Sequence, residues 1–173
     1  MAVLTRASLC LVALLVMAGC RTGPEQWGSF RGRVVDAETE KPIAGAHVMV
    51  MWVRERPALH LTESFFDAQE TVTDLDGRFE IPRQRRILTA WVTGPAVSVF
   101  APGYLMLEPK VTPPGGLAYV DPTVVRMRPL TTLEERCRFR PREPFGPTTA
   151  VPRYLTAVQA YNLRLECFGL LGT

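Results

Sequence analysis

The sequence contains little histidine, no closely spaced cysteine pair and no long apolar run. Two histidines among 173 residues are too few for a histidine-rich metal centre, and 173 residues are too few for a large hydrolase domain. No Cys-x-x-Cys spacing occurs, so a redox or zinc site of that kind is not expected. The formal net charge of +3 is too small for a chain that binds nucleic acid by neutralising phosphates. The length fits one domain, and 13 glycines with 15 prolines indicate many turns.

The N-terminus has the three parts of an export signal. Arg6 lies in a short basic segment, an apolar run follows over residues 7–20, and small residues precede Cys20. The run is shorter than the roughly 20 residues that span a bilayer, so a membrane-spanning helix is not expected in the mature protein. The end of this segment, Met17-Ala18-Gly19-Cys20, resembles the bacterial lipobox, although Met17 replaces the usual leucine. The resemblance implies cleavage before Cys20 and lipidation of its thiol, and a plain secretory signal is the alternative.

Residues 1–19 are therefore the expected signal peptide, and residues 20–28 are a tether between the lipid and the fold. The acyl chains of such an anchor would make the membrane a partner. Arg21 stands where an aspartate often retains lipoproteins in the inner membrane, so the resemblance implies the outer membrane, facing the periplasm.

Two cysteines would remain for the folded domain. Cys10 would leave with the signal and Cys20 would be lipidated, which leaves Cys137 and Cys167. In an oxidising compartment this pair predicts one disulfide, and two separately buried thiols are the alternative. Closing a loop of about 30 residues would stabilise the domain by roughly 3 kcal/mol in the chain-entropy model.

Alternating apolar and polar residues predict a β-sandwich. The alternation begins at Phe30 and returns in a longer, more apolar run up to Trp52. Residues 54–68 are charged and irregular, which favours a loop or a crossing segment. Further strands are expected at 69–73, 78–81, 87–93, 96–101 and 123–128. Six or seven short strands favour two antiparallel sheets packed face to face.

The C-terminal part has a helical pattern. Apolar residues recur at spacings of four, three, four and three, at Tyr154, Val158, Tyr161, Leu165 and Phe168. Pro152 suits the first turn and Gly169 a helix end. We expect this face to pack on the sandwich with Cys167 joined to Cys137; a partner-binding helix is the alternative.

Four sequence blocks occur in order and carry a family resemblance. They are FRGRVVD at 30–36, KPIAGAHV at 41–48, TDLDGRFEIP at 73–82 and VFAPGY at 99–104. They are similar to the carboxypeptidase regulatory-like domain over roughly residues 29–107. The resemblance implies a mainly β, transthyretin-like (prealbumin-like) antiparallel sandwich of seven strands.

That sandwich would occupy residues 29–128, with an Arg-rich segment and a C-terminal α-helix in 129–173. The residues of these blocks are explained by folding and not by chemistry. Gly45 and Gly77 fit turns that need positive φ, and Val48 and Phe79 fit core positions.

Candidate chemistry in the sequence is weak. His60 and Glu63 match the H-x-x-E pair of zinc carboxypeptidases, but no later histidine completes a three-ligand site. In the resembled family this domain adjoins a catalytic domain and is not itself catalytic. The Tyr-Arg-Gly-Ser tail of the related hydroxyisourate hydrolases is missing. Asp74 and Asp76 favour a hairpin turn over a calcium loop, because the remaining ligand positions are absent. No metal or cofactor is therefore expected, and a non-catalytic role is favoured, with an unrecognised hydrolase as the remaining alternative.

Two side-chain groups are candidates for binding. One is the set of arginines Arg126, Arg128, Arg136, Arg138, Arg140 and Arg142. It fits either a solvated strand face or a patch for anionic lipid or lipopolysaccharide phosphates. The other is the set of aromatics Trp27, Trp52, Trp91, Tyr104 and Tyr119. It fits a glycan platform, although Trp52 and Trp91 are better explained as core.

The sequence thus favours a non-catalytic, lipid-anchored envelope protein that serves as a structural or interaction module, with an envelope protein or glycan as a partner and no nucleic acid. The alternative is a ligand-binding lipoprotein that recognises an envelope glycan or peptide through two insertions in the family pattern, residues 51–69 and 83–96.

Overall fold

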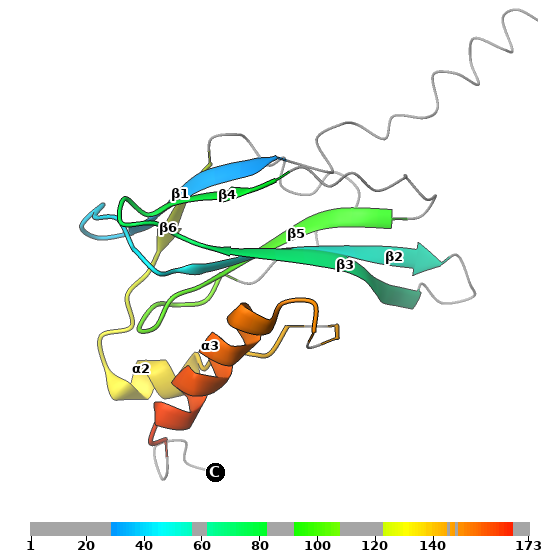
Figure 1. Ribbon diagram of the computed structural model, residues 1–173. Coiled ribbons are helices and arrows are strands. Elements are labelled where there is room, and N and C mark those ends of the chain that lie inside the picture. Colours follow the sequence, from blue (N-terminus) through cyan, green and yellow to red (C-terminus); the bar gives the residue numbers. More distant parts are fainter. Residues whose placement is uncertain are drawn as a thin grey trace, which may run out of the picture.

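The computed structural model describes residues 29–56, 62–82, 92–107, 123–144, 146–147 and 149–167. These residues are mainly β and form two three-stranded sheets with a layer of helix on one side (Figure 1). In chain order the elements are β1 (Phe30–Asp36), β2 (His47–Arg56), β3 (Thr62–Val72), β4 (Arg78–Ile81), β5 (Val92–Phe100), β6 (Thr123–Met127), α2 (Leu133–Arg138) and α3 (Pro152–Arg164).

The strand order is β4-β1-β6 in one sheet and β3-β2-β5 in the other. All pairs are antiparallel except β1 and β6, which run parallel from the Gly32–Thr123 pair to the Asp36–Met127 pair. The fully antiparallel arrangement expected from the sequence is therefore wrong at this pair. Parallel neighbours require a long connection that returns to the same end of the sheet, and here that connection includes the strands β2 to β5, which lie between β1 and β6 in the chain.

The core lies between the two sheets. The alternating residues of β1 and β2 enter it, as expected from their period of two, and Val48, Trp52 and Phe79 are buried there. The other face of β2 and β5 carries Met49 and Phe100, which pack under α3 in a second cluster. The sheet β3-β2-β5 is thus covered on both faces, which explains why β2 is apolar on both sides.

The segment 54–68 is not the loop expected from its charges. β2 continues to Arg56, and β3 begins at Thr62, so the two form a long antiparallel hairpin around residues 57–61, which lie outside the described residues. The register shifts between Trp52 and Val53, and the guanidinium of Arg54 stacks on the ring of Phe66, with 5.0 Å to its centroid. Backbone pairing and this stacking hold the charged residues in strands.

Gly94 and Pro95 do not divide the expected strands at 87–93 and 96–101. β5 runs through both residues, and its register against β2 shifts between Met51 and Val53, opposite them. A proline is tolerated here because β5 is an edge strand. Residues 83–91 lie outside the described residues.

Two expected turns are confirmed. Gly45 and Gly77 have φ of +74° and +71°. A Cβ on Gly77 would come within 2.4 Å of the carbonyl oxygen of Val34, so this position needs glycine on two grounds. The carboxylate of Asp74 accepts the backbone N–H groups of Asp76 and Arg78, which is the hairpin turn predicted in place of a calcium loop.

The C-terminal helix packs on the sandwich, as expected. Tyr154 and Val158 of α3 are fully buried against the outer face of the sheet β3-β2-β5 (Figure 1). Cys137 and Cys167 form a disulfide with a Cα–Cα distance of 5.6 Å. The helix ends at Arg164, before the expected Gly169, and Leu165 is already extended. Among the described residues, no helix is both long and apolar enough to cross a bilayer.

The short helix α2 was not predicted. Thr132 caps its N-terminus, and Thr132 and Glu135 form a reciprocal capping box. The T-x-x-E spacing that produces this box is present in the sequence, but the segment was interpreted only as rich in arginine.

Candidate functional site

A shallow cavity of about 410 Å³ lies between α3 and the first residue of β2. Its lining consists of His47, Pro152, Arg153, Thr156, Ala157 and Ala160. We call it the His47 groove. The α3 residues lie on one helical face because they are spaced by three or four positions. Small side chains on this face keep the groove open.

Glu70 of β3 fixes the helix above the groove. Its carboxylate accepts the backbone N–H of Arg153 at 3.0 Å and that of Tyr154 at 2.7 Å, and its side chain is only 11% exposed. The N-cap residue Val151 has no side-chain hydrogen bond, so a carboxylate from the sheet replaces the usual local cap. The negative charge also lies at the positive end of the helix dipole.

The imidazole of His47 lies in a mixed environment. Its ring is 6.3 Å from that of Phe100 and 6.5 Å from that of Tyr154. Burial lowers the pKa of His47 below its usual value, the Glu70 carboxylate opposes this shift, and the Arg153 guanidinium adds to it. These effects together favour the neutral imidazole, which offers one hydrogen-bond donor and one acceptor.

A buried polar contact joins β5 to α3. The hydroxyl groups of Ser98 and Tyr154 are hydrogen-bonded at 2.8 Å, and Ser98 also donates to the carbonyl of Leu107. Both side chains are fully buried, so Ser98 is a structural hydroxyl with no access to a substrate.

The groove is an open, mostly apolar surface. Its apolar part comes from Pro152, Ala157 and Ala160, and His47, Arg153 and Thr156 complete its lining. The Arg153 side chain is 73% exposed, and its Nε is 3.8 Å from Glu70. Within the described ranges, no group of three histidine, cysteine or acidic side chains could hold a metal ion.

Comparison with known proteins gives no family. No protein-family model matches the chain, and no curated protein matches it. Among solved structures, the crystal structure of a 9R-lipoxygenase from Cyanothece PCC8801 is similar at 19% identity over 73% of this chain, with a TM-score of 0.29. The chain spans about a fifth of that structure's length, since the match covers 19% of it. At this TM-score the likeness supports neither a fold assignment nor an activity.

Most of the six arginines already have partners within the fold. Arg126 pairs with Glu40 at 2.6 Å, and Arg138 pairs with Glu134 at 2.9 Å. Arg128 pairs with Glu135 at 2.9 Å, and this hydrogen bond, with those from the backbone N–H groups of the α2 cap, lowers the pKa of Glu135 to about 2.

Of the other three arginines, one has a hydrogen-bond partner. Arg136 donates to the carbonyl of Leu130. No contact is described for Arg140 or Arg142. Three of the six arginines thus form ion pairs with glutamates and a fourth donates to a backbone carbonyl, which favours the solvated-face interpretation of the sequence.

The aromatic set is not assembled by the described residues. Trp52 is 1% exposed and belongs to the core, as expected. The Tyr104 hydroxyl donates to Asp36. Burial and then this hydrogen bond raise the pKa of Tyr104. The pKa of Asp36 is lowered chiefly by the backbone N–H groups of Thr39 and Glu38, with a smaller effect of Tyr104. The other members, Trp27, Trp91 and Tyr119, lie outside the described residues.

Two further predicted sites are outside the structure's description. Cys20 belongs to the undescribed N-terminal residues. His60 lies in the undescribed turn between β2 and β3, and the side chain of Glu63 is not described.

Sequence reasoning missed the groove. His47 sits inside one of the family-like blocks, where its neighbours Ala46 and Val48 suggest only a strand. Glu70 and Arg153 are 83 residues apart, so nothing local connects them. The one available signal was Val151, because a helix start without a capping side chain implies a cap from elsewhere.

Proposed function

We propose that the chain is an exported lipoprotein of the bacterial cell envelope, and that its folded part is a non-catalytic structural or interaction module. The observation that carries this proposal is the Cys137–Cys167 disulfide, because disulfides persist in oxidising compartments outside the cytosol. The export signal and the lipobox-like Met17-Ala18-Gly19-Cys20 support the same compartment.

The module is proposed to be a carboxypeptidase regulatory-like domain with the transthyretin-like fold. The two packed sheets and the turn glycines Gly45 and Gly77 support this, because both turns fall inside the resembling blocks. The module is proposed to be non-catalytic because the spacings in the sequence assemble no recognisable catalytic or zinc-binding set. An outer-membrane location facing the periplasm completes the proposal.

Intact-mass spectrometry of the protein purified from native membranes tests it. We expect a chain that begins at Cys20 and carries the mass of its acyl chains, with a gain of two hydrogen atoms when the disulfide is reduced. The matched control is Cys20→Ala, which should leave the folded domain intact and release it from the membrane fraction. An unmodified N-terminus beyond residue 20, or free Cys137 and Cys167 thiols, would contradict the proposal.

A second candidate, a ligand-binding lipoprotein, is favoured by the His47 groove. The expected ligand surface over residues 51–69 is not a loop, since the described part of that segment belongs to the paired strands β2 and β3. The groove offers a different surface for an envelope glycan or peptide. Titration with such fragments should move the His47 imidazole signals in NMR spectra. Ala160→Leu, which fills the groove from an exposed position, should abolish the response.

A further inference from the structure

The outer face of the sheet β4-β1-β6 carries a concentration of arginine. Figure 1 shows α2 and α3 on the opposite side of the sandwich, so neither helix covers this face. Burial alternates along the strands, because Phe79 and Val125 enter the core while the residues beside them are exposed. The exposed positions include four arginines, Arg31 and Arg33 of β1, Arg78 of β4 and Arg126 of β6. Such a face can hold an anion where an arginine is not already neutralised.

Arg33 is the arginine of this set that has no carboxylate partner among the described residues. The other three form ion pairs, Arg31 with Glu80, Arg78 with Asp76 and Arg126 with Glu40. The Nε of Arg33 donates to the backbone carbonyl of Asp76 at 2.9 Å, and no hydrogen bond joins its two terminal nitrogens to any part of the chain that the structure describes. Because β1 is the central strand, this uncompensated charge lies in the middle of the face.

Arg33 also stands directly opposite a second arginine. The register of β1 and β4 pairs Arg33 with Arg78. The backbone N–H of Val34 donates to the carbonyl of Gly77, so the adjacent arginine pair is of the non-hydrogen-bonded kind. In such pairs the Cα atoms are about 4.5 Å apart and the side chains are closest. Like charges at directly opposite positions destabilise a sheet.

The neighbouring pair shows that the fold does not require this repulsion. Arg31 and Glu80 are the next pair of the same kind along the two strands, and they form an ion pair at 3.0 Å. A carboxylate at position 33 or 78 would give the same stabilisation. The sequence instead places two guanidinium groups together, and an anion between them would replace their repulsion with attraction to a shared partner.

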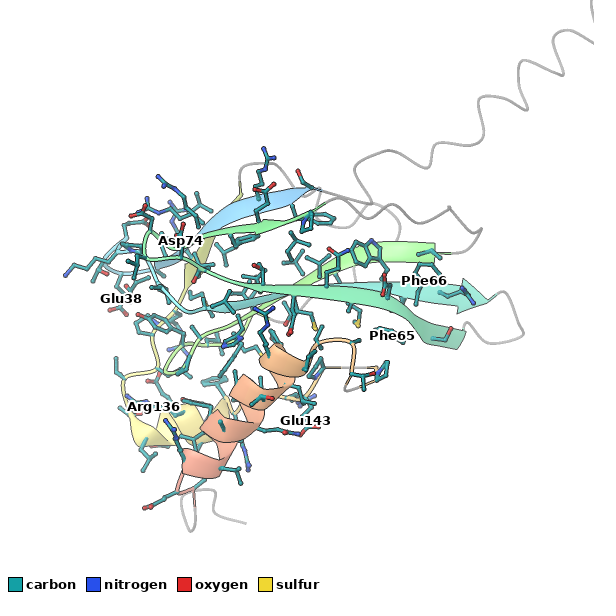
Figure 2. All side chains as sticks on the ribbon, viewed as in Figure 1. Glu38, Phe65, Phe66, Asp74, Arg136 and Glu143 are labelled. Carbon is teal, nitrogen blue, oxygen red and sulfur yellow. A yellow bond between two sulfur atoms is a disulfide. The ribbon has the colours of Figure 1, made fainter. Side chains whose placement is uncertain are left out.

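Both guanidinium groups contact the same turn residue, Asp76. Arg33 donates to its backbone carbonyl, and the Nη1 of Arg78 lies 3.0 Å from its carboxylate Oδ2. The Asp76 carboxylate thus compensates one of the two positive charges. Asp74, which lies in the same turn and is labelled in Figure 2, accepts the backbone N–H groups of Asp76 and Arg78 and forms no ion pair with either arginine. The remaining N–H groups of the two arginines are therefore held around one turn.

We propose that Arg33 and Arg78 form a binding site for a phosphate group. A phosphate monoester carries about two negative charges and three acceptor oxygens, so it can accept hydrogen bonds from both guanidinium groups at once. A carboxylate has two oxygens and matches a single guanidinium. Val124, which pairs with Arg33 from β6 and is 47% exposed, offers an apolar contact to the group that carries the phosphate. This site goes beyond the proposed function and does not depend on the lipid anchor.

NMR spectra of the arginine Nε–H groups test the site in the full mature chain, dispersed in an uncharged detergent at constant ionic strength. The probes are glycerol 3-phosphate as a monoester, dimethyl phosphate as a diester of the kind found in lipid headgroups, and acetate as a carboxylate. We expect saturable shifts of the Arg33 and Arg78 signals with glycerol 3-phosphate, and none at Arg126. Equal saturation by dimethyl phosphate would identify lipid headgroups as a source of the phosphate, and its absence would identify monoesters; both outcomes support the site.

Three variants measure the contribution of single groups. Arg33→Gln should weaken binding of glycerol 3-phosphate by at least about fivefold, because charge-assisted hydrogen bonds are lost. The matched control is Arg31→Gln, which removes the same charge from the same strand and should change the affinity by less than about twofold, because exposed charges are screened. Asp76→Asn removes the carboxylate that competes with phosphate for Arg78 and should strengthen binding by about twofold or more. A gain in affinity cannot result from a damaged fold.

Four results would overturn the proposal. The first is the absence of a saturable shift at Arg33 with either phosphate probe, and the second is equal affinity for acetate. The third is equal weakening by Arg31→Gln and Arg33→Gln, which would indicate a diffuse counter-ion effect. The fourth is an unchanged affinity in Asp76→Asn. The lipid anchor is judged separately by acyl mass, so the failure of one proposal leaves the other standing.

Discussion

Glu70 supplies the most informative perturbation of the fold, because it is the only described side chain that caps α3. Glu70→Ala removes two acceptors from the backbone N–H groups of Arg153 and Tyr154, which are 3.0 and 2.7 Å away. Loss of a helix cap costs about 1 kcal/mol. Loss of a partly buried charge at the helix N-terminus adds about 1 kcal/mol. We therefore expect the free energy of unfolding to fall by about 2 kcal/mol.

Glu70→Gln removes the charge and keeps one of the two acceptors. Its NH2 group takes the place of the second carboxylate oxygen and faces a backbone N–H, so this variant should cost about 1 to 2 kcal/mol. The matched control is Glu80→Gln, which removes the exposed pair with Arg31 and should change stability by less than about 0.5 kcal/mol. Urea unfolding followed by far-UV circular dichroism measures all three variants. Hydrogen exchange at the amides of Arg153 and Tyr154 reports the cap directly. The reasoning would be refuted if Glu70→Ala matched the Glu80 control and left both amides protected.

Three further measurements address other parts of the molecule. Gly77→Ala should destabilise the protein by at least about 2 kcal/mol more than Gly45→Ala in urea unfolding, because both have positive φ but only the first new Cβ meets a backbone oxygen. The His47 imidazole should titrate below pH 6.5 by NMR; a midpoint above 6.5 would contradict its burial. Glu135 should titrate near pH 2, and Arg128→Gln should raise the pKa of Glu135 toward 4.5. Because this pKa is lowered by folding, the ionised Glu135 carboxylate stabilises the folded state above pH 4.5, and that stabilisation is lost as the pH falls toward 2.

Features determined by a few adjacent residues could be predicted from the sequence. The turn Asp74–Gly77 depends on one carboxylate and one glycine with positive φ, and both residue types can be read directly from the sequence. The alternation that leads to Trp52 is equally local, because each residue of a strand faces opposite to its neighbour. Cys137 and Cys167 were paired on the basis of compartment and count, and the disulfide confirms that prediction.

Features determined by a neighbouring strand could not be predicted in this way. The charges at the end of β2 suggested a loop, yet backbone hydrogen bonds to β3 and β5 hold Arg54 in a central strand. Pro95 suggested a break, yet β5 continues through it because the strand lies at the edge of its sheet. The parallel pairing of β1 with β6 likewise depends on where a long connection returns. In each case tertiary pairing overrides the local signal.

The two ends of α3 likewise could not be predicted from local sequence. Its periodicity located the buried face correctly, because Tyr154 and Val158 contact the sheet. Its boundaries come from outside its own sequence. The N-terminus is capped by Glu70, 83 residues earlier in the chain, and Val151 contributes no side-chain cap. Beyond the C-terminus, the disulfide at Cys167 holds the chain beside α2, and the helix ends before the glycine that a local rule would choose. The groove beside His47 exists because both ends are held in this way, so its position follows from the sheet and the disulfide and could not follow from the helix pattern alone.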